Sequence, residues 1–76
     1  MPRWRPCKRK DFIRKIVKLG FSDPEAGARH QVMRYGSYKQ IIPNNPEYSI
    51  PQVKKLLKQV EEKIGRDISI NEWNEL

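Results

Sequence analysis

The chain has 76 residues, of which 37% are apolar and 33% charged, and its formal net charge at pH 7 is +7. A chain of this length can build only one hydrophobic core, so we expect a single small domain. One cysteine and one histidine exclude an internal disulfide, a cysteine-based zinc cluster and the commonest metal-ligand sets, and no cofactor is expected.

The positive charge is concentrated in residues 1–18, which hold eight lysines and arginines against a single acidic residue, Asp11. In the rest of the chain, basic and acidic side chains balance. A basic segment of this kind favours a polyanion as partner, because lysine and arginine release counterions from a phosphate backbone. A solvated helix face is the competing interpretation.

Residues 1–7, MPRWRPC, contain two prolines and no apolar period, which predicts a flexible basic arm ahead of one domain over residues 8–76. Trp4 is expected to be exposed in this arm, with stacking on an unpaired base as the alternative. Prolines and basic residues interrupt this end of the chain, and no run approaches the roughly 20 apolar residues of a membrane span. We therefore expect a soluble, cytoplasmic protein without membrane contact.

A helix is predicted from Lys8 to Leu19, because apolar residues recur there at spacings of three and four. Gly20 is expected to end it as a C-terminal cap. The next residues, FSDPEAGA, are weak as a strand because Asp23-Pro24 and Gly27 break it, so at most a short strand begins at Gly20 or Phe21.

A β-hairpin is predicted from HQVMRY and YKQII, joined by a two-residue Gly36-Ser37 turn. In this register Tyr35 faces Tyr38, and Arg34 faces Lys39. Alternation then assigns two sets of side chains to opposite faces: His30, Val32, Arg34, Lys39 and Ile41 on one, and Met33, Tyr35, Tyr38 and Ile42 on the other. Both faces are partly apolar, so the pattern leaves open which one meets the helices. The opposed pair of basic residues is a mild indication of a bound phosphate.

The segment PNNPEY is predicted to be a loop, and two capping boxes follow it. Ser49 with Gln52 starts a second helix that runs to about Ile64 before Gly65, and Ser69 with Glu72 starts a short last helix. The simplest packing is an α+β layer, a small antiparallel sheet with both long helices on one face. The expected core residues are Phe12, Ile16, Val53 and Trp73.

Four segments of the chain, KRKDFIRKIVKLGF, GARHQVMRYGSYKQIIPN, VKKLLKQV and ISINEW, resemble in this order the HicA toxins of bacterial and archaeal toxin–antitoxin pairs. The resemblance covers nearly the whole chain. It implies a fold similar to a double-stranded RNA-binding domain, with a three-stranded antiparallel sheet under two helices. It also implies ribosome-independent cleavage of messenger RNA and neutralisation by a HicB antitoxin.

The resemblance places the histidine of the family at His30, within a glycine, any residue, basic residue, histidine element that starts at Gly27. The common Gly-Ser-His form is replaced by Ala28-Arg29-His30. The family often has a second histidine after the proline that closes the hairpin, where this chain offers Asn44, Asn45 and Glu47.

RNA carries its own nucleophile, the 2′-hydroxyl, so one imidazole acting as general base or acid can support metal-independent cleavage. A single histidine predicts a weak nuclease. Arg29 is the first candidate to stabilise the transition-state charge, with Arg34 and Lys39 as further phosphate contacts or, equally, as a solvated face. Gly27 allows close backbone approach. The residues expected to follow the RNA backbone are Lys8, Arg9, Lys10, Arg14 and Lys15.

Two alternatives to an endoribonuclease remain. A non-catalytic RNA-binding module of the same fold would use His30 only to hydrogen-bond a phosphate. A DNA-binding module is weaker, because the apolar stripe of the second long helix is committed to packing and leaves no obvious recognition helix.

Overall fold

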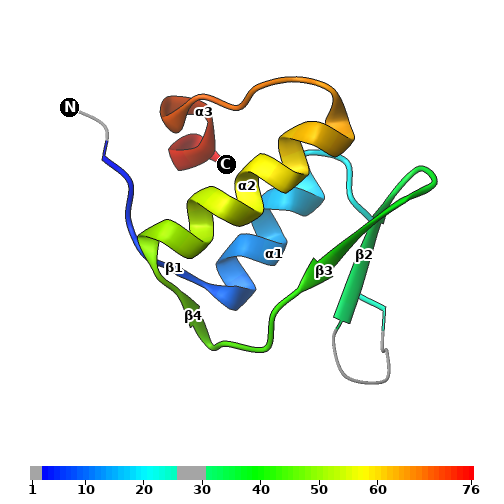
Figure 1. Ribbon diagram of the computed structural model, residues 1–76, viewed down its shortest axis with the longest axis horizontal. Coiled ribbons are helices and arrows are strands. Elements are labelled where there is room, and N and C mark those ends of the chain that lie inside the picture. The colour runs from blue at the N-terminus through cyan, green and yellow to red at the C-terminus, as the bar shows by residue number, and fades with distance from the viewer. Residues whose placement is uncertain (1–2, 26–30) are drawn as a thin grey trace.

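The computed structural model describes residues 3–25 and 31–76 (Figure 1). In this part of the chain three helices and two small two-stranded antiparallel sheets make up the domain. The α+β class is as predicted, whereas a single small sheet was expected. The strands are β1 (Cys7–Lys8), β2 (Gln31–Tyr35), β3 (Tyr38–Ile42) and β4 (Glu47–Tyr48), and the helices are α1 (Arg9–Lys18), α2 (Ile50–Ile64) and α3 (Ile70–Glu75). None of the helices in the described residues is long and apolar enough to cross a membrane.

Helix α1 forms where its apolar stripe predicts it and buries Phe12 and Ile16 completely. It ends in a Schellman motif: the N–H of Gly20 bonds the carbonyl of Val17, and the N–H of Phe21 bonds the carbonyl of Ile16, at 3.0 and 3.1 Å. Phe21 is buried beside this last turn. The predicted glycine cap is therefore confirmed.

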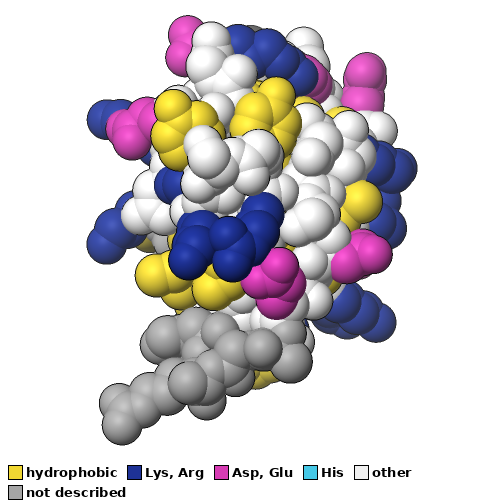
Figure 2. Space-filling view, turned by 90° about the vertical axis from the view of Figure 1, so that its right-hand side faces the viewer, with side chains coloured by type: hydrophobic (Ala, Val, Ile, Leu, Met, Phe, Trp, Pro, Cys, Tyr) yellow, Lys and Arg dark blue, Asp and Glu magenta, His cyan; other side chains and the backbone are white. Residues whose placement is uncertain are grey.

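The β2–β3 hairpin has the predicted register, with Tyr35 opposite Tyr38 and Arg34 opposite Lys39. The structure also decides which face meets the helices. Met33 and Ile42 are fully buried in the core, whereas the opposite face carries Lys39 and a half-exposed Ile41. Figure 2 views this outer face, on which basic side chains lie at the centre.

The third strand of the expected sheet is reduced to a bridging segment. Ser22 N–H bonds the carbonyl of Arg34 and Glu25 N–H bonds that of Val32, both at 2.8 Å, but only Glu25 forms a β-bridge. The reason is local: Pro24 lies between these two donors and has no N–H. Residues 26–30 lie outside the described part of the chain.

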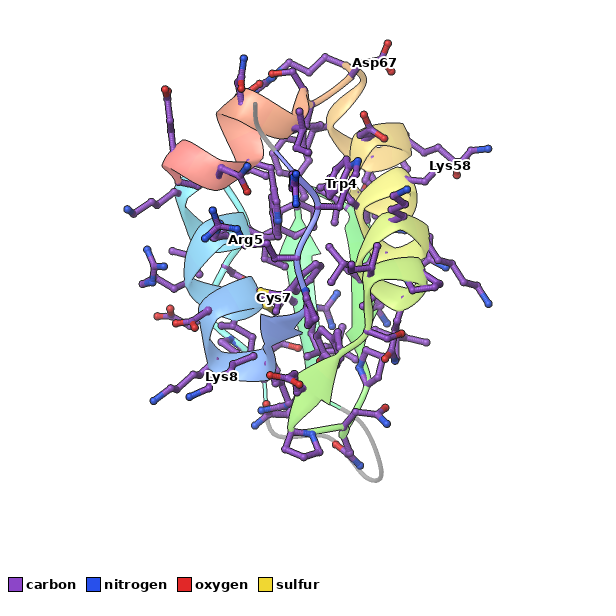
Figure 3. All side chains as sticks on the ribbon, turned by 90° about the vertical axis from the view of Figure 1, so that its left-hand side faces the viewer. Trp4, Arg5, Cys7, Lys8, Lys58 and Asp67 are labelled. Carbon is purple, nitrogen blue, oxygen red and sulfur yellow. The ribbon has the colours of Figure 1, made fainter. Side chains whose placement is uncertain are left out.

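The structure differs from the predicted flexible arm at Trp4 and Cys7, and from the predicted loop PNNPEY at Glu47 and Tyr48. Cys7 pairs with Tyr48, which joins β1 to β4, and both side chains are buried. Trp4 is half-buried against the core instead of exposed, with Lys54 Nζ 5.8 Å from its ring centroid. Figure 3 shows this N-terminal segment running between α1 and α2.

Both predicted capping residues start their helices, although neither capping box closes on its second side. Ser49 Oγ accepts from the N–H of Gln52 at 3.4 Å, and Ser69 Oγ accepts from the N–H of Glu72 at 3.1 Å. The Gln52 amide instead donates to Asn45. The Glu72 carboxylate instead accepts two hydrogen bonds from Arg66, at 2.7 and 2.8 Å.

The core is organised around Phe12, whose ring contacts Tyr48 and Trp73 at centroid distances of 5.5 and 5.3 Å. The four predicted core residues are all buried. Tyr48 was not among them, yet it is fully buried and its hydroxyl donates to the carbonyl of Pro43 at 2.6 Å. The hydroxyl therefore ties β4 to the segment that leaves β3.

Replacing Gly20 is expected to destabilise the domain more than replacing Gly65. Both glycines have positive φ, +115° and +77°, but a Cβ on Gly20 would lie 3.0 Å from the Tyr35 ring, whereas a Cβ on Gly65 meets open space. Gly65→Ala should cost about 1–2 kcal/mol, the ordinary penalty of a left-handed residue. Gly20→Ala should cost more, because steric contact is added. Urea unfolding of both variants measures this, and equal losses would contradict it.

Candidate nucleic-acid interface

A basic groove lies where the N-terminal segment passes the first turns of α1. Its volume is about 410 Å³, and its basic side chains are Arg5, Lys8, Arg14 and Lys15. Two acidic residues, Asp11 and Glu47, also line it. Figure 3 views this side of the molecule, with Arg5, Cys7 and Lys8 labelled along the N-terminal segment. The groove therefore gathers charges from the N-terminal segment with β1, from α1 and from β4 around one concave, mostly basic surface.

Lys15 is the least available of these cations because it is bound internally. Its Nζ donates to the backbone carbonyl of Trp73 at 2.7 Å and lies 4.8 Å from the centroid of the Trp73 ring. Burial lowers the pKa of the Lys15 ammonium. These contacts hold α3 against α1 and leave fewer donors of Lys15 for a ligand.

Arg9, which is also expected to follow an RNA backbone, holds α1 to the hairpin. Its Nε donates to the carbonyl of Pro43 at 3.1 Å, and its guanidinium donates to the side-chain oxygen of Gln31. These bonds join the first turn of α1 to the exit of β3 and to the start of β2. Two of the five guanidinium donors of Arg9 are therefore committed within the protein.

Lys8, Lys10 and Arg14 are exposed, and so is Arg5. Arg14 lies at 4.0 Å from Asp11 and at 3.5 Å from the carbonyl of Leu76, both weak contacts at the surface. Lys10 does not line the groove. Sequence reasoning missed Arg5, which it assigned to a flexible arm. Its positive charge within the basic N-terminal segment is the sequence signal that points to it.

The like-charged pair on the hairpin, Arg34 and Lys39, has a carboxylate of the protein, that of Glu25, beside it. Arg34 Nε donates to both carboxylate oxygens of Glu25, at 3.0 and 3.1 Å, while Lys39 is exposed on the neighbouring strand. Glu25 had no expected role. Its carboxylate offsets the repulsion between Arg34 and Lys39, so this pair no longer indicates a bound phosphate.

The catalytic candidates of the sequence, Gly27, Arg29 and His30, lie outside the described residues. The nearest described neighbour of His30 in the chain is Gln31, the residue bonded by Arg9. Across residues 3–25 and 31–76, no cluster of three or more histidine, cysteine or acidic side chains is arranged to hold a metal ion.

Cys7 also lines the groove, and its thiol is protected by burial. It is 8% exposed, and burial raises the pKa of its thiol, although the neighbouring Lys15 opposes this shift. Since the thiolate is the reactive form, Cys7 is a packing residue here.

No protein family, no curated protein and no solved structure matches the chain.

The tethering role of Lys15 can be tested by its effect on stability. Lys15→Ala removes both the hydrogen bond to Trp73 and the contact with its ring, and should lower the free energy of unfolding by about 1–2 kcal/mol. Lys18→Ala, on the exposed end of the same helix, should change it by less than about 0.5 kcal/mol. Denaturant titrations followed by tryptophan fluorescence compare the two variants. Similar values for both would show that Lys15 is only a surface charge.

Proposed function

We propose that this protein is a HicA-like endoribonuclease that binds single-stranded messenger RNA through its basic groove and cleaves it with His30. In this proposal the domain has the arrangement of a double-stranded RNA-binding domain and acts in the cytoplasm. A HicB-like antitoxin neutralises it. The observation that carries the RNA-binding part is the groove itself, in which exposed Arg5, Lys8 and Arg14 converge from two elements.

Phosphate binding fits this groove for reasons of charge and shape. Its basic residues outnumber its acidic ones, and a concave surface allows several cations to contact successive phosphates of one strand. Such contacts supply affinity and register without reading the base sequence. The internal bonds of Arg9 and Lys15 limit their share, so we assign the main contacts to Arg5, Lys8 and Arg14.

The proposed chemistry is a transphosphorylation that needs no external nucleophile. The imidazole of His30 takes the proton of a ribose 2′-hydroxyl, the oxygen attacks the adjacent phosphorus, and the bond to the 5′-oxygen of the next nucleotide breaks. The leaving oxygen then takes a proton from the imidazolium or from water. Arg29 stabilises the charge that develops on the phosphorane.

The hydrogen bond between Arg9 and Gln31 supports the proposal that RNA bound in the basic groove also reaches the cleavage site. It joins the first turn of α1, which follows Lys8, to the first residue of β2, which follows His30 in the chain. An RNA strand bound at Lys8 therefore lies near the start of β2.

The groove is tested by removing its charges. Arg5→Ala, Lys8→Ala and Arg14→Ala combined should weaken binding of a labelled single-stranded RNA at least about tenfold, and lower the slope of log affinity against log salt by about 2. The matched control is the triple variant Lys18→Ala, Lys58→Ala and Lys63→Ala, which loses the same net charge elsewhere. Equal losses in both variants would mean that only total charge matters, and the groove would not be the site.

The nuclease is tested by His30→Ala. Cleavage of the same RNA, measured under single-turnover conditions, should fall by a factor of about 10² to 10⁴, while RNA affinity stays within a few-fold of the parent. A parent protein that binds RNA but cleaves none would leave a non-catalytic RNA-binding module. A variant that cleaves as fast as the parent would remove His30 from the mechanism.

A further inference from the structure

Among the described residues, β3 has no neighbouring strand on its outer edge, and the hydrogen bonds on the other edge of the hairpin show which of its backbone groups face outward. The backbone N–H of Ser22 donates to the carbonyl of Arg34, and the N–H of Arg34 donates to Ser22 Oγ. The backbone polar groups of Arg34 therefore point away from β3. In an antiparallel ladder, the residue opposite such a position also points away from its partner strand. Lys39 stands opposite Arg34 and therefore turns its backbone groups outward.

The same reasoning applies one pair further along. Glu25 bonds the carbonyl of Val32, and Ile41 stands opposite Val32, so the backbone of Ile41 also faces outward. Its carbonyl already accepts from the Gln40 amide at 3.1 Å. The remaining outward groups are the N–H and carbonyl of Lys39 and the N–H of Ile41, and no described residue bonds them.

A groove of about 330 Å³ adjoins this edge, between β3 and α2. It is lined by Ile41 and Pro43 on the strand side and by Gln52, Lys55, Leu56 and Gln59 on the helix side. Ile41 is 56% exposed, one of the most exposed large apolar side chains in the described residues. The lining contains one basic residue and no acidic one.

We propose that β3 is a docking edge for an extended segment of a partner protein, in which apolar and acidic side chains alternate. The segment adds to the hairpin as a further strand and bonds the three open backbone groups. Side chains of an added strand alternate between two faces. One set enters the groove over Leu56, and the other lies beside Lys39 on the outer face. Apolar residues suit the first set and carboxylates the second.

Charge excludes a second copy of the chain as the preferred occupant. Each copy carries a formal net charge of +7 and would bring its own Lys39 to the shared edge. A partner that presents acidic side chains on the outer face instead gains from pairing with Lys39. The other edge of the hairpin is bonded by residues 22–25, so β3 offers the edge available for addition.

The probe for this edge is a synthetic peptide of about nine residues, the length of a long strand, with alternating valine and glutamate. Titrated into the ¹⁵N-labelled protein, it should bind saturably, shift the amide signals of Lys39 and Ile41, and slow their exchange with solvent. A peptide with lysine in place of glutamate should bind at least about tenfold more weakly. Binding that does not saturate, or shifts confined to the basic groove of Arg5 and Lys8, would overturn the proposal.

Lys39→Pro is the decisive variant, because it removes an outward N–H without removing a bond of the hairpin. It should weaken the peptide about tenfold, whereas Lys39→Ala, which keeps the N–H, should weaken it about threefold or less. If Lys39→Pro fails to fold, Ile41→Glu tests the same edge by repulsion, with Ile41→Thr as its control. Unchanged peptide affinity in Lys39→Pro or Ile41→Glu would overturn the proposal. Sedimentation that shows dimers of the protein without peptide, and loss of these dimers in Lys39→Pro, would also overturn it, because a second copy would then occupy the edge.

This edge is separate from the proposed RNA groove. The triple variant at Arg5, Lys8 and Arg14 should bind the peptide like the parent, within about twofold. Loss of RNA binding and loss of peptide binding are therefore distinguishable outcomes.

Discussion

The contact of Phe12 with Tyr48 and Trp73 is the constraint on which the rest of this small domain depends. It joins α1 at one end of the chain to α3 at the other and to β4 between them. The hydroxyl of Tyr48 and the guanidinium of Arg9 both bond the carbonyl of Pro43, so the exit of the hairpin is fixed to the same cluster. Chains of this size bury little apolar surface. In one shared aromatic cluster, each buried ring packs against several elements at once.

Internal bonds decide how much of the positive charge a ligand can meet. Lys15 and Arg9 hold elements together, and Arg34 is paired with Glu25. The exposed cations of the N-terminal segment and α1 remain accessible, as do those on the outer side of α2. The threading of that segment between the long helices, which sets Arg5 beside Lys8 and Arg14, thus creates the groove.

Local patterns predict most of this fold. The helix stripes, the two N-terminal caps and the hairpin register follow from residues close together in the chain, and the structure confirms them. The pairing of β1 with β4 could not be predicted in this way. Strands of two residues show no alternation, and their partner is far along the chain. The same holds for the site: the basic segment was recognised, but the internal partners of Arg9, Lys15 and Arg34 depend on tertiary contacts. The prediction for His30 stays a prediction.

The bond between Lys15 and Trp73 spans 58 positions, and the ring of Trp73 closes the aromatic centre. During synthesis, one side of the Phe12 ring on α1 therefore stays uncovered until α3 has left the ribosomal tunnel. Local helix formation is fast, but closing such a long loop is slow and opposed by chain entropy. The aromatic centre is therefore complete only after α3 has been synthesised and has packed against α1.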